Sequence, residues 1–361
     1  MDLRRSSSWG VLNVLVLSGA FALEAACSSA SPASAVPAAP KGDASYSLPQ
    51  GPDDGGNVFA DGAPPLQAFV RIAHTSPDAA PFDVCLAPHG TPAFEGPILA
   101  QFAADFTSAG ASVGDAAAGG DAGAVGVAFS QVSAYVPIAP GLYDVRLVAA
   151  GAPSCLGSSP PDASPIEAGD SDVVGEDGGS SVALPDDVTL PPLVANTFST
   201  LLIAGDLHPA GDDAPLTVTL LPDDAELAGG AASLRAINAV PSAVTLDFGL
   251  GSGAGWMPLL TQVAFAHASA TTGPGQGSVD GDGYVSIPTF SAQTMSACES
   301  SSSDAAAGLA VDTNVDIELG AIATVIAIGG KTGDSAHPPA LLVCIDNQPS
   351  GGLLSDCSVG P

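Results

Sequence analysis

Hydrophobic and polar positions alternate over short stretches of this chain, which is the pattern of half-buried β-strands. In the stretch LYDVRL, Tyr143, Val145 and Leu147 would lie on one face and Asp144 and Arg146 on the other. Other stretches, such as QAFVRIAH, are largely apolar, as a buried strand would be. Turn-forming residues separate the stretches and almost no helical period is present, so we expect an all-β fold.

Seven stretches of this kind occupy the first part of the chain, at residues 67–74, 82–87, 128–138, 142–150, 188–193, 197–204 and 216–221. Two interruptions, 107–126 and 156–187, are low in complexity, and the second contains eight acidic residues and no basic one. Such segments cannot bury enough apolar surface to order themselves, so we expect solvated loops there.

The opening stretch of this part occurs twice. FVRIAHTSPDAAPFDVCL (69–86) aligns without a gap on LRAINAVPSAVTLDFGL (234–250). An internal repeat of this kind sets the architecture before any single residue is considered. The aligned pairs are Arg71 with Arg235, His74 with Asn238, Pro77 with Pro241, Asp83 with Asp247 and Leu86 with Leu250.

The stretches that follow the repeat also recur in order. FSQV is echoed by LTQV (260–263), YVPI by YVSI (284–287), NTFSTLLIAG by GAIATVIAIG (320–329), and residues 216–221 by 341–345. Short strands with turns between them favour β-sandwiches. We therefore predict two tandem Ig-like β-sandwich domains, at residues 66–225 and 231–358.

The charge of the chain is strongly unbalanced, with 38 acidic residues against 7 lysines and arginines and a formal net charge of −31. Only five of those cations lie beyond Arg4 and Arg5. Phosphate recognition needs clustered Lys or Arg, so the composition excludes nucleic acid as a partner and disfavours an anionic membrane surface.

The N-terminus has the features of an export signal. Arg4 and Arg5 precede the apolar run VLNVLVLSGAFAL, which is too short to span a bilayer comfortably, and Glu24-Ala-Ala-Cys27 follows. This pattern resembles a bacterial lipoprotein signal, although Glu24 stands where an aliphatic residue is usual. Residues 1–26 would be removed, Cys27 would be lipidated and 27–65 would form a disordered tether. The alternative is ordinary secretion after cleavage at Ala22.

Export places the six cysteines in an oxidising compartment, so disulfides are expected. If Cys27 carries lipid, five thiols remain and one is unpaired, whereas otherwise all six could pair. Our hypothesis joins Cys85 to Cys155 and Cys344 to Cys357, which leaves Cys298 as the odd one. No CxxC pair exists, which disfavours a zinc site.

Three motifs resemble a bacterial family known only as domain of unknown function 4397: VRIAHTSPDAAPFDV (70–84), VPIAPGLYDVRLVAAG (136–151) and LPPLVANTFSTLLIAGD (190–206). The resemblance covers most of residues 66–225 and, more weakly, 231–358. It implies an exported or surface-anchored, Ig-like β-sandwich. It implies no reaction, because none has been assigned to that family.

His74, Asp78 and Asp83 form the candidate chemical cluster, because a histidine and two carboxylates could hold a metal or act as acid and base. The second copy replaces His74 and Asp78, so the fold does not need them. We favour a structural role in which His74 bonds the backbone of the adjacent turn. The recurring Arg71 and Asp83 are interpreted as a tie between neighbouring strands of one domain.

The remaining candidates favour structure over chemistry. Asp280-Gly-Asp-Gly283 lacks the further ligands of a calcium loop and is interpreted as a hairpin turn. Trp256 is assigned to the core. His89, His208, His267 and His337 lie in predicted loops without a Gly-x-Ser-x-Gly motif. We therefore predict no catalytic residue, metal or cofactor.

These observations favour a non-enzymatic lipoprotein of the cell envelope with a structural or interaction role. It would be held at the outer membrane or cell surface by lipid on Cys27, or be secreted if Cys27 is not lipidated. A surface adhesion or carbohydrate-binding module is the first alternative, and an envelope enzyme is the second. The candidate partner is an envelope protein or a glycan.

Overall fold

The computed structural model describes residues 66–108, 125–155, 187–224, 231–251, 255–300, 309, 313–330, 336–346 and 357–359. The expected signal peptide, the tether with Cys27 and most of the two interruptions lie outside these residues. The regular secondary structure of the described part is mostly β-strand, as predicted. No helix in it is both long and apolar enough to cross a bilayer.

The first half of the molecule (residues 66–224) contains two sheets. One has the order β3-β1-β7-β8, with β4 also on β1, and the other has the order β2-β5-β6. The elements are β1 (Ala68–His74), β2 (Phe82–Pro88), α1 (Ile98–Ser108), β3 (Gln131–Val132), β4 (Val136–Ile138), β5 (Tyr143–Ala149), β6 (Val188–Thr189), β7 (Phe198–Ala204) and β8 (Thr217–Asp223).

The second half (residues 231–359) also contains two sheets, with the orders β13-β9-β16-β17-β18 and β12-β11-β10-β14-β15. The elements are β9 (Ala232–Asn238), β10 (Thr245–Leu250), β11 (Met257–Ala264), β12 (Thr271–Thr272), β13 (Tyr284–Ile287), β14 (Phe290–Glu299), β15 (Thr313–Ile317), β16 (Ile322–Ile328), β17 (Ala340–Ile345) and β18 (Cys357–Val359).

The internal repeat is visible in the strand pairing. β1 pairs in parallel with β7, and β9 pairs in parallel with β16, whereas the other strand pairs are antiparallel. The registers also match, because Arg71 lies opposite Thr200 and Arg235 lies opposite Thr324. The aligned opening motifs and the echo of NTFSTLLIAG in GAIATVIAIG are therefore confirmed.

One predicted echo is wrong. The Ser133 hydroxyl accepts a hydrogen bond from the Ile72 N–H at 2.8 Å, and the Ser269 hydroxyl accepts one from the Ala236 N–H at 3.2 Å. The counterpart of FSQVS is therefore FAHAS (265–269), and not LTQV, which belongs to β11. Both segments also contain a residue with positive φ, Ser130 in the first and Ala266 in the second.

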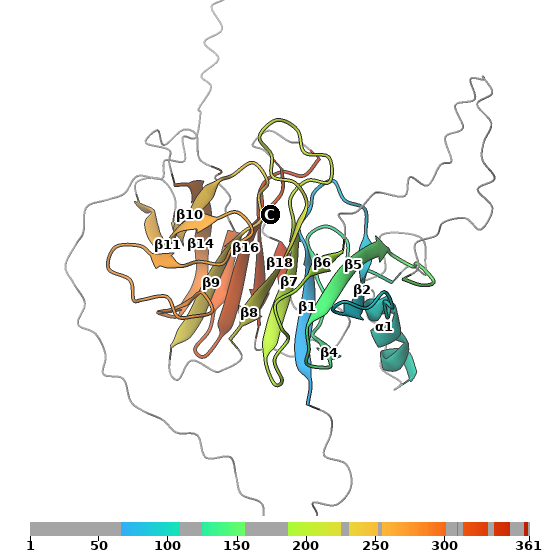
Figure 1. The fold of residues 1–361 in the computed structure, drawn as a ribbon. Coiled ribbons are helices and arrows are strands. Elements are labelled where there is room, and N and C mark those ends of the chain that lie inside the picture. Colours follow the sequence, from blue (N-terminus) through green and yellow to red (C-terminus); the bar gives the residue numbers. More distant parts are fainter. Residues whose placement is uncertain are drawn as a thin grey trace, which may run out of the picture.

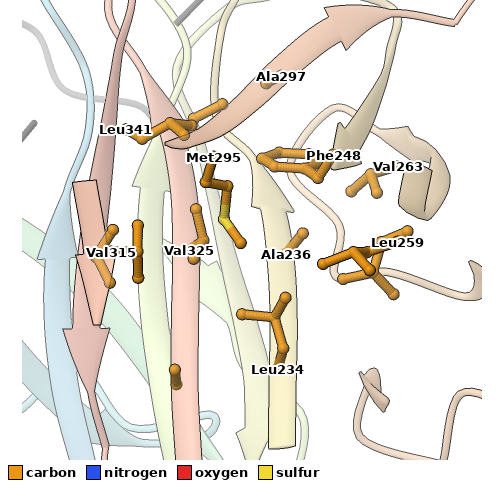
Figure 2. Packing of buried hydrophobic residues seen from close by; sticks show 14 of the residues in the cluster. Leu234, Ala236, Phe248, Leu259, Val263, Met295, Ala297, Val315, Val325 and Leu341 are labelled. Atoms are coloured by element: carbon orange, nitrogen blue, oxygen red, sulfur yellow. The ribbon is translucent and has the colours of Figure 1, made fainter. Parts of the chain in front are cut away.

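Three apolar cores lie between four layers of sheet. In Figure 1 the sheets containing β1 and β9 lie in the middle, with β2, β5 and α1 outside one of them and β10, β11 and β14 outside the other. The core of the second half brings together side chains from β9, β16 and β17 and from β10, β11 and β14, including Leu234, Val325 and Met295 (Figure 2).

The third core joins the two halves. It packs Ala73 and Leu202 of the first half against Ile237, Ile326 and their neighbours in the second. Alternate residues of β1, β7, β9 and β16 therefore face either their own core or the other half. Strands buried on both faces lose the apolar–polar alternation, which explains the largely apolar sequences of β7 and β16.

Helix α1 was not expected from the sequence. It packs Leu99 and Ala103 against the first core, and its first turn is capped by the carboxylate of Asp83. Asp83 accepts hydrogen bonds at 3.0 Å from the N–H groups of Leu99 and Ala100. In the second half β11 pairs with the corresponding strand β10, and Asp247 accepts the Gln262 N–H at 2.7 Å.

The structure contains both hypothesised disulfides, Cys85–Cys155 and Cys344–Cys357. Cys298 is disulfide-bonded as well, so the expectation that it remains the odd thiol is wrong. Disulfides persist in oxidising compartments, so these bridges indicate a non-cytoplasmic location.

Candidate functional site

The candidate chemical cluster of His74, Asp78 and Asp83 does not form. Asp78 accepts backbone N–H groups of the β7–β8 loop at 2.7 and 2.8 Å, and Asp83 caps α1. The His74 ring lies 4.3 Å from the ring of Phe82, and neither of its nitrogens has a hydrogen-bond partner. The ring nitrogens interact only weakly with the adjacent turn, through the nearby backbone of Ala79 and Ala80. The three side chains therefore face different parts of the molecule and do not form a common site.

The protonation state of His74 follows from its burial. Desolvation lowers its pKa to about 4, although the nearby backbone of Ala80 and Ala79 opposes the change. A neutral imidazole without a carboxylate partner is not set up for acid–base catalysis. Within the described part of the chain, no group of three or more His, Cys, Asp or Glu side chains could hold a metal ion.

Arg71 has different partners from those the sequence suggested. The expected tie to Asp83 is wrong, because Asp83 faces α1 and Arg71 points into the interface between the halves. Arg71 Nη1 donates to Asp346 Oδ1 at 2.6 Å, across 275 residues of sequence. Its Nε donates to the Thr200 hydroxyl at 2.8 Å and lies 3.4 Å from Asp223 Oδ2.

Arg235 makes the reciprocal contacts from the second half. Its Nη2 lies 2.5 Å from Asp223 Oδ1, and its Nη1 donates to the carbonyl of Pro222. Its Nε and Nη2 also donate to the Thr324 hydroxyl, at 3.3 and 3.1 Å. Each half therefore provides an arginine that binds the aspartate of the other half.

Two tyrosines complete the arrangement. Tyr135 donates to Asp223 Oδ2 at 2.7 Å, and its ring lies 5.1 Å from the Arg71 guanidinium. Tyr284 donates to Asp346 Oδ2 at 3.0 Å, and its ring lies 4.7 Å from the Arg235 guanidinium. We call this set the Arg–Asp network. It consists of Arg71, Tyr135, Thr200, Asp223, Arg235, Tyr284, Thr324 and Asp346.

The Arg–Asp network is almost completely buried, since the side chains of its two arginines and two aspartates are at most 2% exposed. Burial alone would raise the pKa of Asp223, but Arg71 and Arg235 outweigh it and hold that pKa below its usual range. Burial would lower the pKa of Arg235, but Asp223 outweighs it and raises that pKa. The charges are thus retained because each faces its opposite.

This geometry can fix the two halves against each other, but it offers little to a ligand. The carboxylate oxygens of Asp223 and Asp346 are already bonded to guanidinium, hydroxyl and phenol groups. Buried charges that are fully paired enforce one docking geometry, because any other would leave a charge unpaired in the interior.

Sequence reasoning missed both aspartates. Asp223 ends β8 and Asp346 directly follows β17, at equivalent positions next to the arginine-bearing sheets. Aligning LLPD (220–223) with VCID (343–346) would have paired these two residues.

The other candidates are structural. The Asp280 carboxylate accepts the N–H groups of Asp282 and Tyr284 at 3.0 and 2.8 Å, which confirms a turn. The turn does not close a hairpin, because the flanking strands β12 and β13 belong to different sheets. Trp256 is 6% exposed and belongs to the core, as predicted. At the surface, His89 Nδ1 lies 2.8 Å from Asp144 Oδ1, a contact that the sequence did not suggest.

No protein-family model matches the chain, and the search of curated proteins finds no relative. The resemblance to the domain of unknown function 4397 family therefore stays a proposal.

Proposed function

We propose that this chain is a non-enzymatic protein of the bacterial cell envelope, exported and lipidated on Cys27. In this proposal residues 66–225 and 231–358 are two tandem Ig-like β-sandwich domains, related to the domain of unknown function 4397 family. Their role is structural or to bind an envelope protein or a glycan. The disulfides support export, and the paired sheets in each half support the domain assignment.

The observation that carries the proposal is the Arg–Asp network. The two arginines that recur in the sequence are buried between the halves and are bound to aspartates. They hold the two halves as one unit, and they are not exposed to a substrate. Loops at the ends of such a unit are the default binding surfaces, because a stable scaffold tolerates variation there.

The carbohydrate-binding alternative requires exposed aromatic rings for stacking. Among the residues whose side-chain exposure the structure describes, every Phe, Tyr and Trp is buried or half-buried. The structural or protein-interaction role is therefore preferred. An envelope enzyme would require converging polar groups at an accessible site, and the dispersal of His74, Asp78 and Asp83 gives it no support.

Lipidation and a disulfide exclude each other at Cys27, because both consume the same thiol. If Cys27 is not lipidated, all six cysteines of the chain could pair. Labelling with a radioactive lipid precursor should mark the wild type and not Cys27→Ala. Unlabelled wild type in the medium, with Cys27 linked to Cys298 in non-reducing mass mapping, would establish the secreted form instead.

A binding screen tests the interaction role. The exported chain, immobilised through its C-terminus, is exposed to a glycan array and to solubilised envelope proteins from the same bacterium. We expect a protein partner that is retained by wild type and lost when the chain is reduced and unfolded. Saturable binding of glycans alone would favour the carbohydrate-binding alternative, and turnover of a glycan would revive the enzyme.

A further inference from the structure

The two halves differ at the end of their first strand. In the second half, Asn238 donates to the carbonyls of Ala243 and Val263 at 3.1 and 3.2 Å, and its side-chain oxygen accepts the Val240 N–H at 3.1 Å. In the first half His74 occupies the same position, fully buried and with no partner for either ring nitrogen. A titratable group therefore replaces a satisfied amide.

His74 is also connected to the interface between the halves. Its ring lies 4.3 Å from Phe82 in the first core and 6.4 Å from Phe129. The ring of Phe129 lies 4.9 Å from His337, which belongs to the second half. In addition, the His74 carbonyl accepts the Ser130 N–H at 2.9 Å. A displacement of His74 would thus move the segment that carries Phe129.

The charged groups near His74 are engaged elsewhere. Asp78 binds the β7–β8 loop, Asp83 caps α1, and Arg71 points to the Arg–Asp network. His337 lies beyond the Phe129 ring and would repel a proton on His74 if it were charged. A proton on His74 would therefore be buried without a counter-charge from the described residues, which is unfavourable.

The sign of the pH effect follows. Burial lowers the pKa of His74 from 6.5 to about 4. An opened state, in which the ring reaches water, binds the proton more tightly than the closed state. The closed state is thus fully favoured above about pH 6.5 and loses stability as the pH falls from there through 4.

The geometry points to an acid-sensitive joint in the first half. When His74 takes a proton from solvent, the β1–β3 end opens and Phe129 leaves His337, while the second half, with Asn238, stays closed. The device is independent of any ligand of the protein, and it makes the contact between the halves respond to acidification of the surroundings.

Hydrogen–deuterium exchange of the full chain at pH 7 and pH 4 tests this joint. After correction for intrinsic exchange, opening of the peptides that cover β1 and 125–133 should increase by roughly 100-fold at pH 4. Peptides from β9 and 265–269 should not follow. Wild-type β1 peptides that open no faster at pH 4 than those of β9 would overturn the proposal.

Two reciprocal variants and one control isolate His74. His74→Asn should remove the acid response of the first half, and Asn238→His should create one in the second. His337→Gln should leave acid opening of β1 intact. An unchanged acid response in His74→Asn refutes the role of His74. If His74→Asn does not fold, the absence of a new acid response in the second half of Asn238→His also refutes the proposal.

Discussion

Both arginines of the Arg–Asp network converge on Asp223, which makes it the most informative single residue. Its carboxylate contacts Arg71 and Arg235 and accepts hydrogen bonds from Tyr135 and Thr200. Removing one member of a buried ion pair leaves an uncompensated charge in the interior, which is costlier than losing the pair itself.

Asp223→Ala should therefore lower the free energy of unfolding by about 3–5 kcal/mol. The matched control is Asp187→Ala, which removes a two-bonded ion pair with Arg146 at the surface, where the side chains are 41% and 34% exposed. That loss should be below about 1 kcal/mol. Urea denaturation measures both, and equal losses would show that the network contributes no more than a surface pair.

The lowered pKa of Asp223 also predicts a pH dependence. The stabilisation from its ionised form is present above the unfolded pKa of 3.8 and is lost as the pH falls through the lower folded value. The stability difference between wild type and Asp223→Asn should therefore be large at pH 7 and shrink below pH 3.8. A difference that is constant over this range, measured by urea denaturation, would contradict the assignment.

Among the elements, α1 depends on a residue that is distant from it in the chain. Asp83 lies on β2 and binds the first-turn N–H groups of the helix. Asp83→Ala should cost about 1–2 kcal/mol and increase hydrogen exchange in residues 99–103. Asp247→Ala, the equivalent change, should leave exchange in α1 unchanged. Undisturbed exchange in Asp83→Ala would mean that packing alone holds the helix.

The two disulfides should differ in their contribution. Cys85–Cys155 closes 70 residues of chain and Cys344–Cys357 closes 13. The loop-closure entropy of the unfolded chain predicts that the longer loop contributes about 1.5 kcal/mol more. Paired Cys→Ala variants, compared by urea denaturation, test this order. A greater loss of stability on removal of Cys344–Cys357 would indicate that packing in the core between the halves, and not loop length, determines the contribution of each disulfide.

For the whole molecule, the third core and the Arg–Asp network predict joint unfolding. Residues of both halves share one apolar cluster, so unfolding of one half would expose apolar surface of the other half to water. Fluorescence of Trp256, in the second half, and hydrogen exchange of β1, in the first, should give coincident urea transitions. Asp223→Ala should separate them. Separate transitions already in wild type would show that the halves are independent.

Local sequence determined much of this fold. Alternation and turn residues placed most strands of the first half, and the repeat of 69–86 in 234–250 predicted a second set with the same parallel pairing. These features were readable because side-chain period and turn chemistry depend on neighbouring residues. The start of α1 could not be predicted in this way, because its cap comes from Asp83, 15 residues before the helix.

Only the tertiary structure decided the role of the recurring arginines. The sequence showed that Arg71 and Arg235 repeat, and it suggested a tie within one domain to a carboxylate or carbonyl, with Asp83 the candidate because it recurs as Asp247. Arg71 in fact binds Asp346 and Asp223, and Arg235 binds Asp223. A buried charge pairs with the groups that lie opposite it once the sheets have stacked. The stacking is determined by the apolar faces of both halves together, and no local sequence pattern contains that information.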